Sequence, residues 1–587
     1  MAQPRRDRVL GQVVRIGGKR RVRSLLVRDT DWADKTNLPE GTIVELARDG
    51  QQADVVRTLA APGTAIHALY KVMGRAQVDP FFPKDVRQEV EAWVADPKID
   101  DPTLRDLTDL DFVTIDNADS KDLDQALYID RLGKGFVLYY ALADGGFYVR
   151  PGTAVFDEAL RRGSSFYLPG VVAPMLPRGL SEDIVSLNPN VDRRAMVFRI
   201  ALDEDGHISE PTEVMQARIR SRAKLTYKGV QRLHDAPGCG PLTERSYTKS
   251  LMLMREVGER RIVLAQKRDV IPFNRVNPVL SLSDDGASFV IGMERRNDVE
   301  RWNEQISLLT NMEGACLLAG DDPQVQAVFR VHPEPEQNAL VALSQRLETI
   351  AKTLGLDTDV WRWDYNPESE HKTLGRFIDA LPDDAQNARL RQAFERQVMM
   401  SISPSLFTQE RGPHFGIGAD LYARFSAPMR EIVGIFTHKE AWEKLEGPAA
   451  HHDHAADEAL REAVIEAGNR SKKIQRRITR EAHKLAMDQS FERELEMDYK
   501  DRPVHVGTVL GVRPSRLYVQ LDNPPMEVKV YHDDIGDQDG TEPEVDKARV
   551  VVSRKNGQNI SLGDEVRLKV GRYDGKRRRW CLIPQGE

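Results

Sequence analysis

Residues 114–130 read TIDNADSKDLDQALYID, a run in which carboxylates gather between two apolar pieces and the last polar position is an amide. The carboxylates are those of Asp116, Asp119, Asp122 and Asp124, and the amide is that of Gln125. The β-rich pieces FVTI and QALYI on either side predict two strands of a sheet, so the aspartates belong to a loop between them. We therefore expect Asp116, Asp122 and Asp124 to converge where the chain turns.

Converging carboxylates need a positive partner, because unit charges about 4 Å apart repel by about 4 kcal/mol at an effective dielectric constant of about 20. Mg²⁺ is the expected partner, since it prefers hard oxygen ligands and is commonly shared between a few carboxylates and phosphates. The alternative is a solvated turn whose aspartates cap the backbone and never meet. The spacing alone leaves both interpretations open.

The chain has 587 residues, of which 30% are charged and 40% hydrophobic. This length exceeds the roughly 250 to 300 residues at which single cores stop growing, so several folded domains are expected. The net charge of −7 argues against a uniformly basic protein, yet positive charge is concentrated in residues 1–30 and in the runs NRSKKIQRRITR and GKRRRW. Each basic segment alone is compatible with a solvated face, but three of them flanking an acidic cluster favour contact with phosphate.

Strand and helix patterns divide the chain into five predicted parts. Short β-rich pieces separated by turns predict a small barrel at each end, and helical patterns dominate the centre. The parts are a barrel at 1–75, a linking helix within 76–104, an α+β body at 105–445, a linker and basic helix at 446–500, and an oligonucleotide-binding (OB) barrel at 503–587. The predicted fold class is α+β and multidomain.

Other features exclude several kinds of protein. The three cysteines, Cys239, Cys316 and Cys581, lack the paired spacing of a zinc site or a disulfide framework, which fits the reducing cytoplasm. We find no apolar run of the roughly 18 residues that a membrane span needs, and no glycine loop that would cradle a triphosphate. The run HHDHAADE at 451–458 is too crowded for an ordered tetrahedral metal site.

Several blocks of the chain resemble a known family in family order. They are the 114–130 segment, VRPGTAVFDEALRRGSSFYLPGVVAPMLPRGLSEDIVSLNPNVDRRAMVF, IRSRAKLTY, FRVHPEPE and HFGIGADLYARFSAPMREIVGIFTHK. Together these blocks cover residues from about 105 to 445 and resemble the ribonuclease II and ribonuclease R exoribonucleases, the RNB family. The resemblance implies an RNB catalytic body flanked by cold-shock-like and S-one-type RNA-binding barrels of the OB kind.

The resemblance also implies a chemistry: hydrolysis of single-stranded RNA from the 3′ end, releasing nucleoside 5′-monophosphates. From the cysteine pattern we expect a cytoplasmic protein, and we expect it to be a monomer. By position, Asp116, Asp122 and Asp124 match the first three catalytic carboxylates and would hold Mg²⁺ or Mn²⁺. Asp124 matches the carboxylate on which the chemistry depends most. Arg430 matches an arginine that holds the scissile phosphate, and Tyr167 matches a tyrosine that stacks on a terminal base.

The chain departs from the family pattern at the last signature position, where Gln125 replaces a second aspartate. A glutamine can offer its carbonyl oxygen to a metal but brings no charge, and Asp119 or Asp144 is the alternative fourth ligand. Restoring the aspartate, Gln125→Asp, is expected to raise activity if the amide limits the site. Around Arg430, the usual Thr-Ser-Pro-Ile-Arg is replaced by SAPMR, and a Tyr and an Asp that commonly follow are replaced by Ile432 and Gly434.

Two functional hypotheses remain open from the sequence. In the first, the chain is an active 3′-to-5′ exoribonuclease, favoured because the three matched aspartates and Arg430 are retained together. In the second, it is a catalytically weakened or inactive relative that keeps the RNA channel and acts by binding RNA. An RNA digestion assay distinguishes them.

Overall fold

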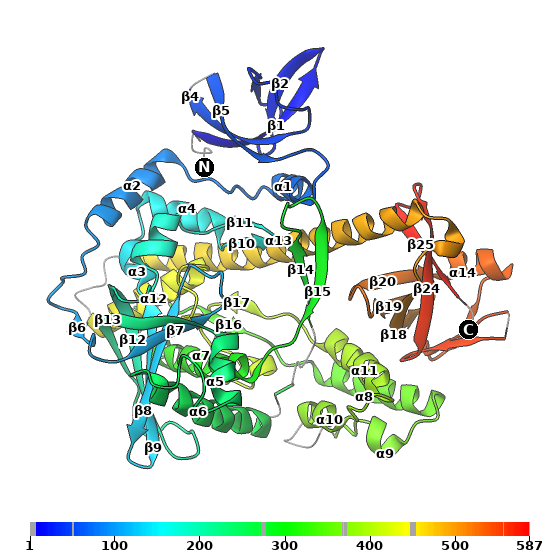
Figure 1. The fold of residues 1–587 in the computed structure, drawn as a ribbon. Coiled ribbons are helices and arrows are strands. Elements are labelled where there is room, and N and C mark those ends of the chain that lie inside the picture. The colour runs from blue at the N-terminus through cyan, green and yellow to red at the C-terminus, as the bar shows by residue number, and fades with distance from the viewer. Residues whose placement is uncertain are drawn as a thin grey trace.

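The computed structural model of the protein describes residues 7–49, 52–268, 270–271, 277–320, 322, 324–366, 368, 373–446, 454–555 and 557–585. A β-barrel lies at each end of the chain, and an α+β body joins them (Figure 1). This confirms the predicted α+β multidomain fold class. Two histidines of the run at 451–458, His451 and His452, lie outside the described residues.

The N-terminal barrel has five antiparallel strands in the order β3-β2-β1-β4-β5. They are β1 (Arg8–Ile16), β2 (Lys19–Ser24), β3 (Asp31–Ala33), β4 (Ile43–Asp49) and β5 (Gln52–Ala60). Contacts between β3 and β5 close the sheet. Its interior is filled by apolar side chains that alternate along the strands, among them Val9, Val13, Val22, Trp32 and Val44.

Two helices lead from this barrel to the body. Helix α1 (Ala65–Ala76) begins where the Thr64 hydroxyl accepts a hydrogen bond from the His67 amide, a standard N-cap. Helix α2 (Lys84–Ala95) begins after Pro83, inside the segment predicted to link the domains. The hairpin of β14 (Asn277–Leu282) and β15 (Phe289–Glu294) reaches α1 with its tip, where the Ala65 amide donates to the Ala287 carbonyl at 2.9 Å.

The body is built on a six-stranded sheet in the order β12-β9-β8-β7-β13-β6, with β12 also paired to β13. Its strands are β6 (Arg105–Asp106), β7 (Phe112–Asp116), β8 (Gln125–Leu132), β9 (Gly135–Ala143), β12 (Asp192–Leu202) and β13 (Glu213–Thr226). Side chains from β9 enter two cores alternately, because successive residues of a strand point to opposite faces. Phe136, Leu138 and Tyr140 enter one core, and Ala141 and Ala143 enter the other.

Helices cover both faces of this sheet, which explains its nearly continuous apolar strands. One core includes residues of α6 (Thr248–Lys267) and α7 (Asp298–Leu318). The other includes residues of α4 (Ala154–Arg162), α12 (Ile432–Glu446) and α13 (His454–Leu495). Helix α13 has 42 residues and runs from the body to the C-terminal barrel (Figure 1).

The C-terminal barrel contains β18 (His505–Arg513), β19 (Arg516–Leu521), β20 (Glu527–Tyr531), β24 (Glu565–Asp574) and β25 (Arg579–Pro584), in the order β20-β19-β18-β24-β25. A small sheet of β21 (Glu544–Val545), β22 (Val551–Ser553) and β23 (Asn559–Ser561) and helix α14 (His532–Asp539) complete it. A helical segment of α8 (Gln337–Thr353), α9 (Thr358–Trp361), α10 (Leu374–Ala380) and α11 (Ala388–Ser401) lies beside the barrel, and α11 contacts β18. Among the described residues, no helix is both long and apolar enough to cross a membrane.

Candidate active site

The aspartate-rich segment is the loop between β7 and β8, as predicted. The two strands are antiparallel with Val113 opposite Leu127, and continuing that register to the strand ends sets Asp116 opposite Asp124. The loop backbone is tied down from neighbouring elements: the Lys224 ammonium donates to the Ala118 carbonyl at 3.0 Å. The Leu123 amide donates to the Ser186 hydroxyl at 3.0 Å. The loop is therefore a fixed platform for its carboxylates.

Asp116 and Asp122 lie at the accessible side of this platform. One oxygen of Asp116 accepts hydrogen bonds from the Asn117 amide at 2.7 Å and the Ser120 hydroxyl at 2.8 Å. The Oδ2 atom of Asp122 accepts from the Tyr167 hydroxyl at 3.4 Å. Asp119, the alternative ligand, is exposed.

Asp124 is the buried carboxylate of the group, with only 2% of its surface exposed. Its Oδ1 accepts from the Met429 amide at 3.1 Å, and its Oδ2 accepts from Arg430 Nε at 2.5 Å. Burial raises the pKa of Asp124 to about 6; the Arg430 charge opposes this shift, and the Asp122 charge adds to it. Through these two hydrogen bonds, Asp124 links the acidic loop to the segment that carries Arg430.

The Arg430 segment is held in place by Asn311 of α7. The Asn311 Oδ1 accepts from the Phe425 amide at 2.7 Å and the Ser426 amide at 3.0 Å. Its Nδ2 donates to the Ser426 hydroxyl at 2.9 Å. All the groups involved are buried, so these bonds fix the backbone that leads to Arg430.

Gln125 bridges the two halves of the site. Its Nε2 donates to the Ser426 carbonyl at 2.7 Å, and its Oε1 accepts from the hydroxyl of Tyr140, a buried residue of β9. Both polar groups of the amide therefore serve contacts within the protein. Tyr140 and Asn311 were not predicted from the sequence, because no local pattern marks either of them.

A partly buried cluster of charges surrounds Glu431, the residue that follows Arg430. The Glu431 carboxylate pairs with Arg424 at 3.2 Å and with Lys472 of α13 at 3.8 Å. Burial alone would raise the pKa of Glu431, but the surrounding cations outweigh it and lower the pKa to about 2. Burial lowers the pKa of Lys472 to about 8 against the opposing effect of Glu431. Positive charge exceeds negative charge here, which favours an anion next to Arg430.

Tyr167 stands at the edge of the site on β10 (Phe166–Leu168), with 43% of its surface exposed. Gln475 of α13 holds its backbone from both sides: Oε1 accepts from the Tyr167 amide at 3.0 Å and Nε2 donates to its carbonyl at 2.9 Å. An exposed aromatic ring therefore lies beside Asp122.

A second acidic cluster lies elsewhere, at Glu440, Glu443 and Asp457. Within the described ranges it is the one set of three potential ligands whose atoms all lie within 4.8 Å of one another, a spacing that the three loop aspartates do not reach as a set. The Lys439 ammonium contacts all three carboxylates, at 2.9, 2.8 and 3.0 Å, so this cluster already holds a cation of its own. Asp144, the other alternative ligand, is fully buried 3.5 Å from Arg194.

Comparison with known proteins defines the class. Residues 104–447, more than half of the chain, match the family model described as the RNB domain, and the protein belongs to this family. Among its relatives, Exoribonuclease 2 of Photorhabdus laumondii is 31% identical over 361 residues, which are 60% of this chain and 53% of the relative. Ribonuclease R of Escherichia coli is 26% identical over 480 residues, 79% of this chain and 55% of the relative. The chain spans about half the length of the curated relatives it matches.

Solved structures agree on the fold. Mycoplasma genitalium RNase R, in complex with ribose methylated single-stranded RNA, has a TM-score of 0.78 and 20% identity, covering 100% of this chain and 90% of that one. Yeast Ssd1, described as a pseudonuclease, has a TM-score of 0.62 and 14% identity, covering 94% of this chain and 68% of that one. The same fold therefore occurs in a nuclease and in a pseudonuclease, and the fold alone does not decide activity.

Proposed function

We propose that the protein is a metal-dependent 3′-to-5′ exoribonuclease that hydrolyses single-stranded RNA to nucleoside 5′-monophosphates, as a cytoplasmic monomer. The observation that carries this proposal is the buried pair of Asp124 and Arg430, fixed by the Met429 amide and faced by Asp122. A buried carboxylate beside a second carboxylate and an arginine is an arrangement suited to phosphodiester chemistry. Residues 1–75, 105–445 and 503–587 are proposed as the barrel, catalytic and barrel domains.

The donor set fits a divalent cation. Asp116, Asp122 and Asp124 offer carboxylate oxygens, the hard ligands that Mg²⁺ and Mn²⁺ take, and each bonded oxygen of Asp124 keeps a second lone pair. The unfavourable effect of Asp122 on the ionisation of Asp124 is a physical reason for a cation between them. Such a cation would lower the pKa of an attacking water and stabilise charge on the phosphate oxygens.

The protein's own residues position the substrate. The Nε of Arg430 donates a hydrogen bond to Asp124. Its Nη groups are the donors proposed to hold the scissile phosphate in a forked geometry. Tyr167 is proposed to stack on the base next to the scissile bond, with its backbone held by Gln475 and its hydroxyl bonded to Asp122. Gln125 is proposed to position the Arg430 segment through Ser426 instead of acting as a fourth metal ligand.

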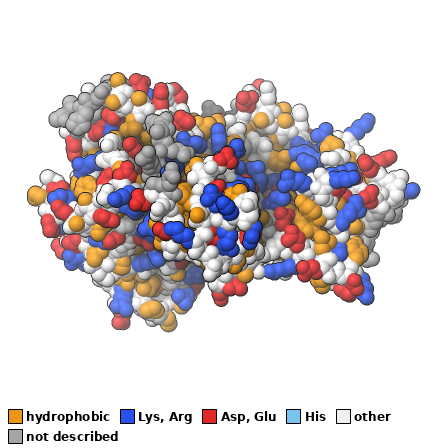
Figure 2. Space-filling view, turned by 90° about the horizontal axis from the view of Figure 1, so that it is seen from above, with side chains coloured by type: hydrophobic (Ala, Val, Ile, Leu, Met, Phe, Trp, Pro, Cys, Tyr) orange, Lys and Arg blue, Asp and Glu red, His pale blue; other side chains and the backbone are white. Residues whose placement is uncertain are grey.

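A basic stripe on α13 is the proposed path of the strand to the site. It consists of Lys473, Arg476, Arg477, Arg480 and Lys484, all exposed. Steps of three and four residues, with Arg476 and Arg477 adjacent, place them on one face of the helix, which extends from the level of Gln475 along the helix axis toward the C-terminal barrel. Seen from above, Lys and Arg side chains gather to the right of the molecule's centre, the region that α13 crosses (Figure 2).

The second candidate function is RNA binding without cleavage. It is favoured by one observation: the amide of Gln125, at the position of a family carboxylate, is uncharged and bonds Ser426 and Tyr140 through its nitrogen and its oxygen. Three carboxylates, those of Asp116, Asp122 and Asp124, are then the ligands proposed for the metal.

A digestion experiment tests the proposal and separates the two candidates. The protein is incubated with 5′-labelled and 3′-labelled oligoribonucleotides and millimolar Mg²⁺ or Mn²⁺, beside an Asp124→Asn control whose thermal unfolding is checked. We expect progressive shortening from the 3′ end and release of 5′-monophosphates by the wild type alone. If both proteins bind RNA and neither shortens it, the RNA-binding candidate replaces the enzyme.

A further inference from the structure

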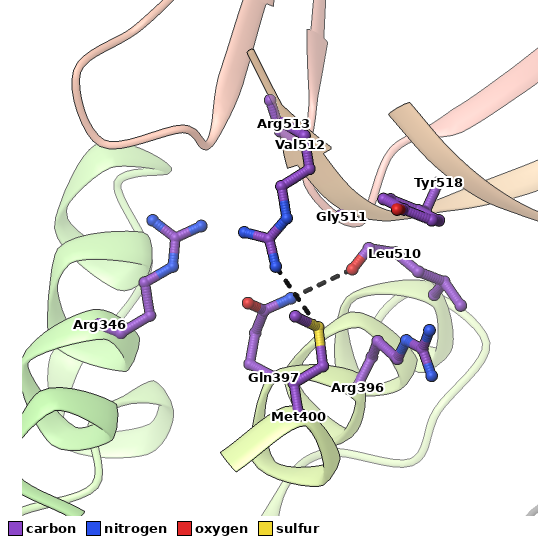
Figure 3. A pocket seen from close by; sticks show the side chains of 9 residues that line it. All are labelled: Arg346, Arg396, Gln397, Met400, Leu510, Gly511, Val512, Arg513 and Tyr518. Atoms are coloured by element: carbon purple, nitrogen blue, oxygen red, sulfur yellow. Dashed lines mark hydrogen bonds between the residues drawn. The ribbon is translucent and has the colours of Figure 1, made fainter. Parts of the chain in front are cut away.

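A cavity of about 140 Å³ lies between the helical segment and the C-terminal barrel, away from the aspartate loop (Figure 3). Its walls come from α8, α11, β18 and β19. The polar and aromatic residues at its edge are Arg346, Arg396, Gln397, Arg513 and Tyr518. The guanidinium groups of Arg346 and Arg513 point toward one another across its opening (Figure 3).

These two arginines form no ion pair within the part of the chain that the structure describes. Arg346 donates to the carbonyls of Ala548 and Arg549, and Arg513 contacts the Met400 sulfur at 3.9 Å. Within the described ranges, neither has a carboxylate at ion-pair distance, whereas Arg396 pairs with Glu527 at 3.0 Å. Desolvation lowers the pKa of Arg346 and the positive charge of Arg513 lowers it further, whereas the carboxylate of Asp546 opposes this shift. Two like charges that face each other need an anion between them.

The remaining groups at the cavity suit a nucleotide phosphate. Gln397 is buried, and its Nε2 donates a hydrogen bond to the Leu510 carbonyl at 3.1 Å. Tyr518 presents an aromatic ring, with Arg516 5.5 Å and Lys529 6.0 Å from its centre. The volume is smaller than the roughly 300 Å³ or more that encloses a whole drug-sized ligand, so one phosphate group fits and the rest of the molecule stays outside.

We propose that the Arg346–Arg513 cavity is an anion site that takes one phosphate group of a nucleotide. The group comes either from within an RNA strand that passes over the barrel or from a free nucleoside monophosphate. A guanidinium fork binds phosphate oxygens through paired hydrogen bonds. Here Arg513 offers such a fork, and Arg346, which donates to the Ala548 and Arg549 carbonyls, adds its charge from another part of the fold. Phosphate binding would therefore also strengthen the contact between the helical segment and the barrel.

The test uses the full chain without divalent metal, so that RNA is bound but not consumed. Binding of a single-stranded oligoribonucleotide lacking terminal phosphates and of adenosine 5′-monophosphate is measured for the wild type and Arg513→Gln. The matched control is Arg567→Gln, an exposed arginine on β24 of the same barrel. We expect Arg513→Gln to weaken binding of the phosphate source about tenfold, as removal of a charge-assisted hydrogen bond does. If the source is RNA, the salt dependence also falls by the equivalent of about one neutralised phosphate.

The pattern of weakened binding identifies the source. If Arg513→Gln weakens binding of the oligonucleotide alone, the site takes an internal phosphate of RNA. If it weakens binding of the monophosphate alone, the site takes a free nucleotide. Because Arg346 also holds the barrel backbone, thermal unfolding in inorganic phosphate and in chloride of equal ionic strength is compared for the wild type and Arg513→Gln. Stabilisation by phosphate in the wild type alone supports the site. Unchanged affinity for both ligands, with equal phosphate effects in both proteins, overturns it.

Discussion

Replacing Gln125 by glutamate distinguishes a positioning role from metal ligation, because the two roles predict opposite results. The substitution keeps the size of the side chain and its contact with the Tyr140 hydroxyl. It removes the Nε2 donor that lies 2.7 Å from the Ser426 carbonyl and sets an anionic oxygen there. The Arg430 segment, which depends on Ser426, should then move away from Asp124.

The size of the effect follows from that one hydrogen bond. Breaking the bond and leaving the carbonyl without a partner costs about 1 to 3 kcal/mol. If the whole cost falls on the transition state, kcat drops between about fivefold and about 150-fold. For Gln125→Asp we expect a similar decrease in kcat, because the shorter aspartate side chain reaches neither Ser426 nor Tyr140. This reverses the expectation from sequence that restoring the aspartate would raise activity.

The assay is cleavage of a 5′-labelled oligoribonucleotide over a series of Mg²⁺ concentrations, which yields kcat and the metal concentration at half-maximal rate. The positioning role predicts a lower kcat with an unchanged metal requirement. Tyr140→Phe serves as the matched variant, since it removes the other bond to the amide, with an expected decrease of about fivefold or less. A glutamate variant that needs less metal and cleaves at least as fast as the wild type would show that position 125 ligates the metal.

Three further predictions follow from other parts of the molecule. Tyr167→Ala should weaken RNA binding in metal-free buffer by about 1 to 3 kcal/mol while Tyr167→Phe binds normally, and equal affinity of both variants would exclude stacking. Replacing Arg477 and Arg480 together by glutamine should reduce the slope of log affinity against log salt by about 0.7 for each phosphate that is no longer neutralised. An unchanged slope would show that the RNA strand does not run along α13. Desolvation opposes protonation of His505, but its bond to Glu494 outweighs this and raises the pKa of His505 above 6.5. The contribution of this pair to the free energy of unfolding should therefore be complete below pH 6.5 and disappear as pH rises through the raised pKa. The difference in melting temperature between the wild type and Glu494→Gln should therefore shrink with rising pH, and a constant difference would contradict the assignment.

The strands could be predicted because their residues alternate or run continuously apolar. In β9, GFVLYYALA, both faces are buried, and the sequence shows this as an unbroken apolar run. Helix α2 could be predicted from Pro83 and the helical spacing of Val86 and Val90. Helix α1 was not separated from the first barrel, because its start depends on a Thr64 cap and on a hairpin from residues 286 and 287.

The site was predictable only as far as one segment contains it. Asp116, Asp122 and Asp124 lie in one loop, so their grouping could be expected from the sequence, and their metal-binding role stays a prediction. The role of Arg430 was predicted from the resemblance to the RNB family. The contacts of Gln125 with Ser426 and of Asn311 with Phe425 join residues 301 and 114 positions apart, and they exist only after the body has packed.

The continuity of α13 couples the geometry of the two ends of the protein. Gln475 supports Tyr167, and Asp488 of the same helix accepts a hydrogen bond from Trp580 of the C-terminal barrel at 2.8 Å. An uninterrupted helix lies between them, with a rise of about 1.5 Å and a turn of about 100° for each residue. Deleting one residue there would swing the barrel around the helix by more than a quarter of a circle, so natural variation in this stretch should preserve its length even where its side chains change.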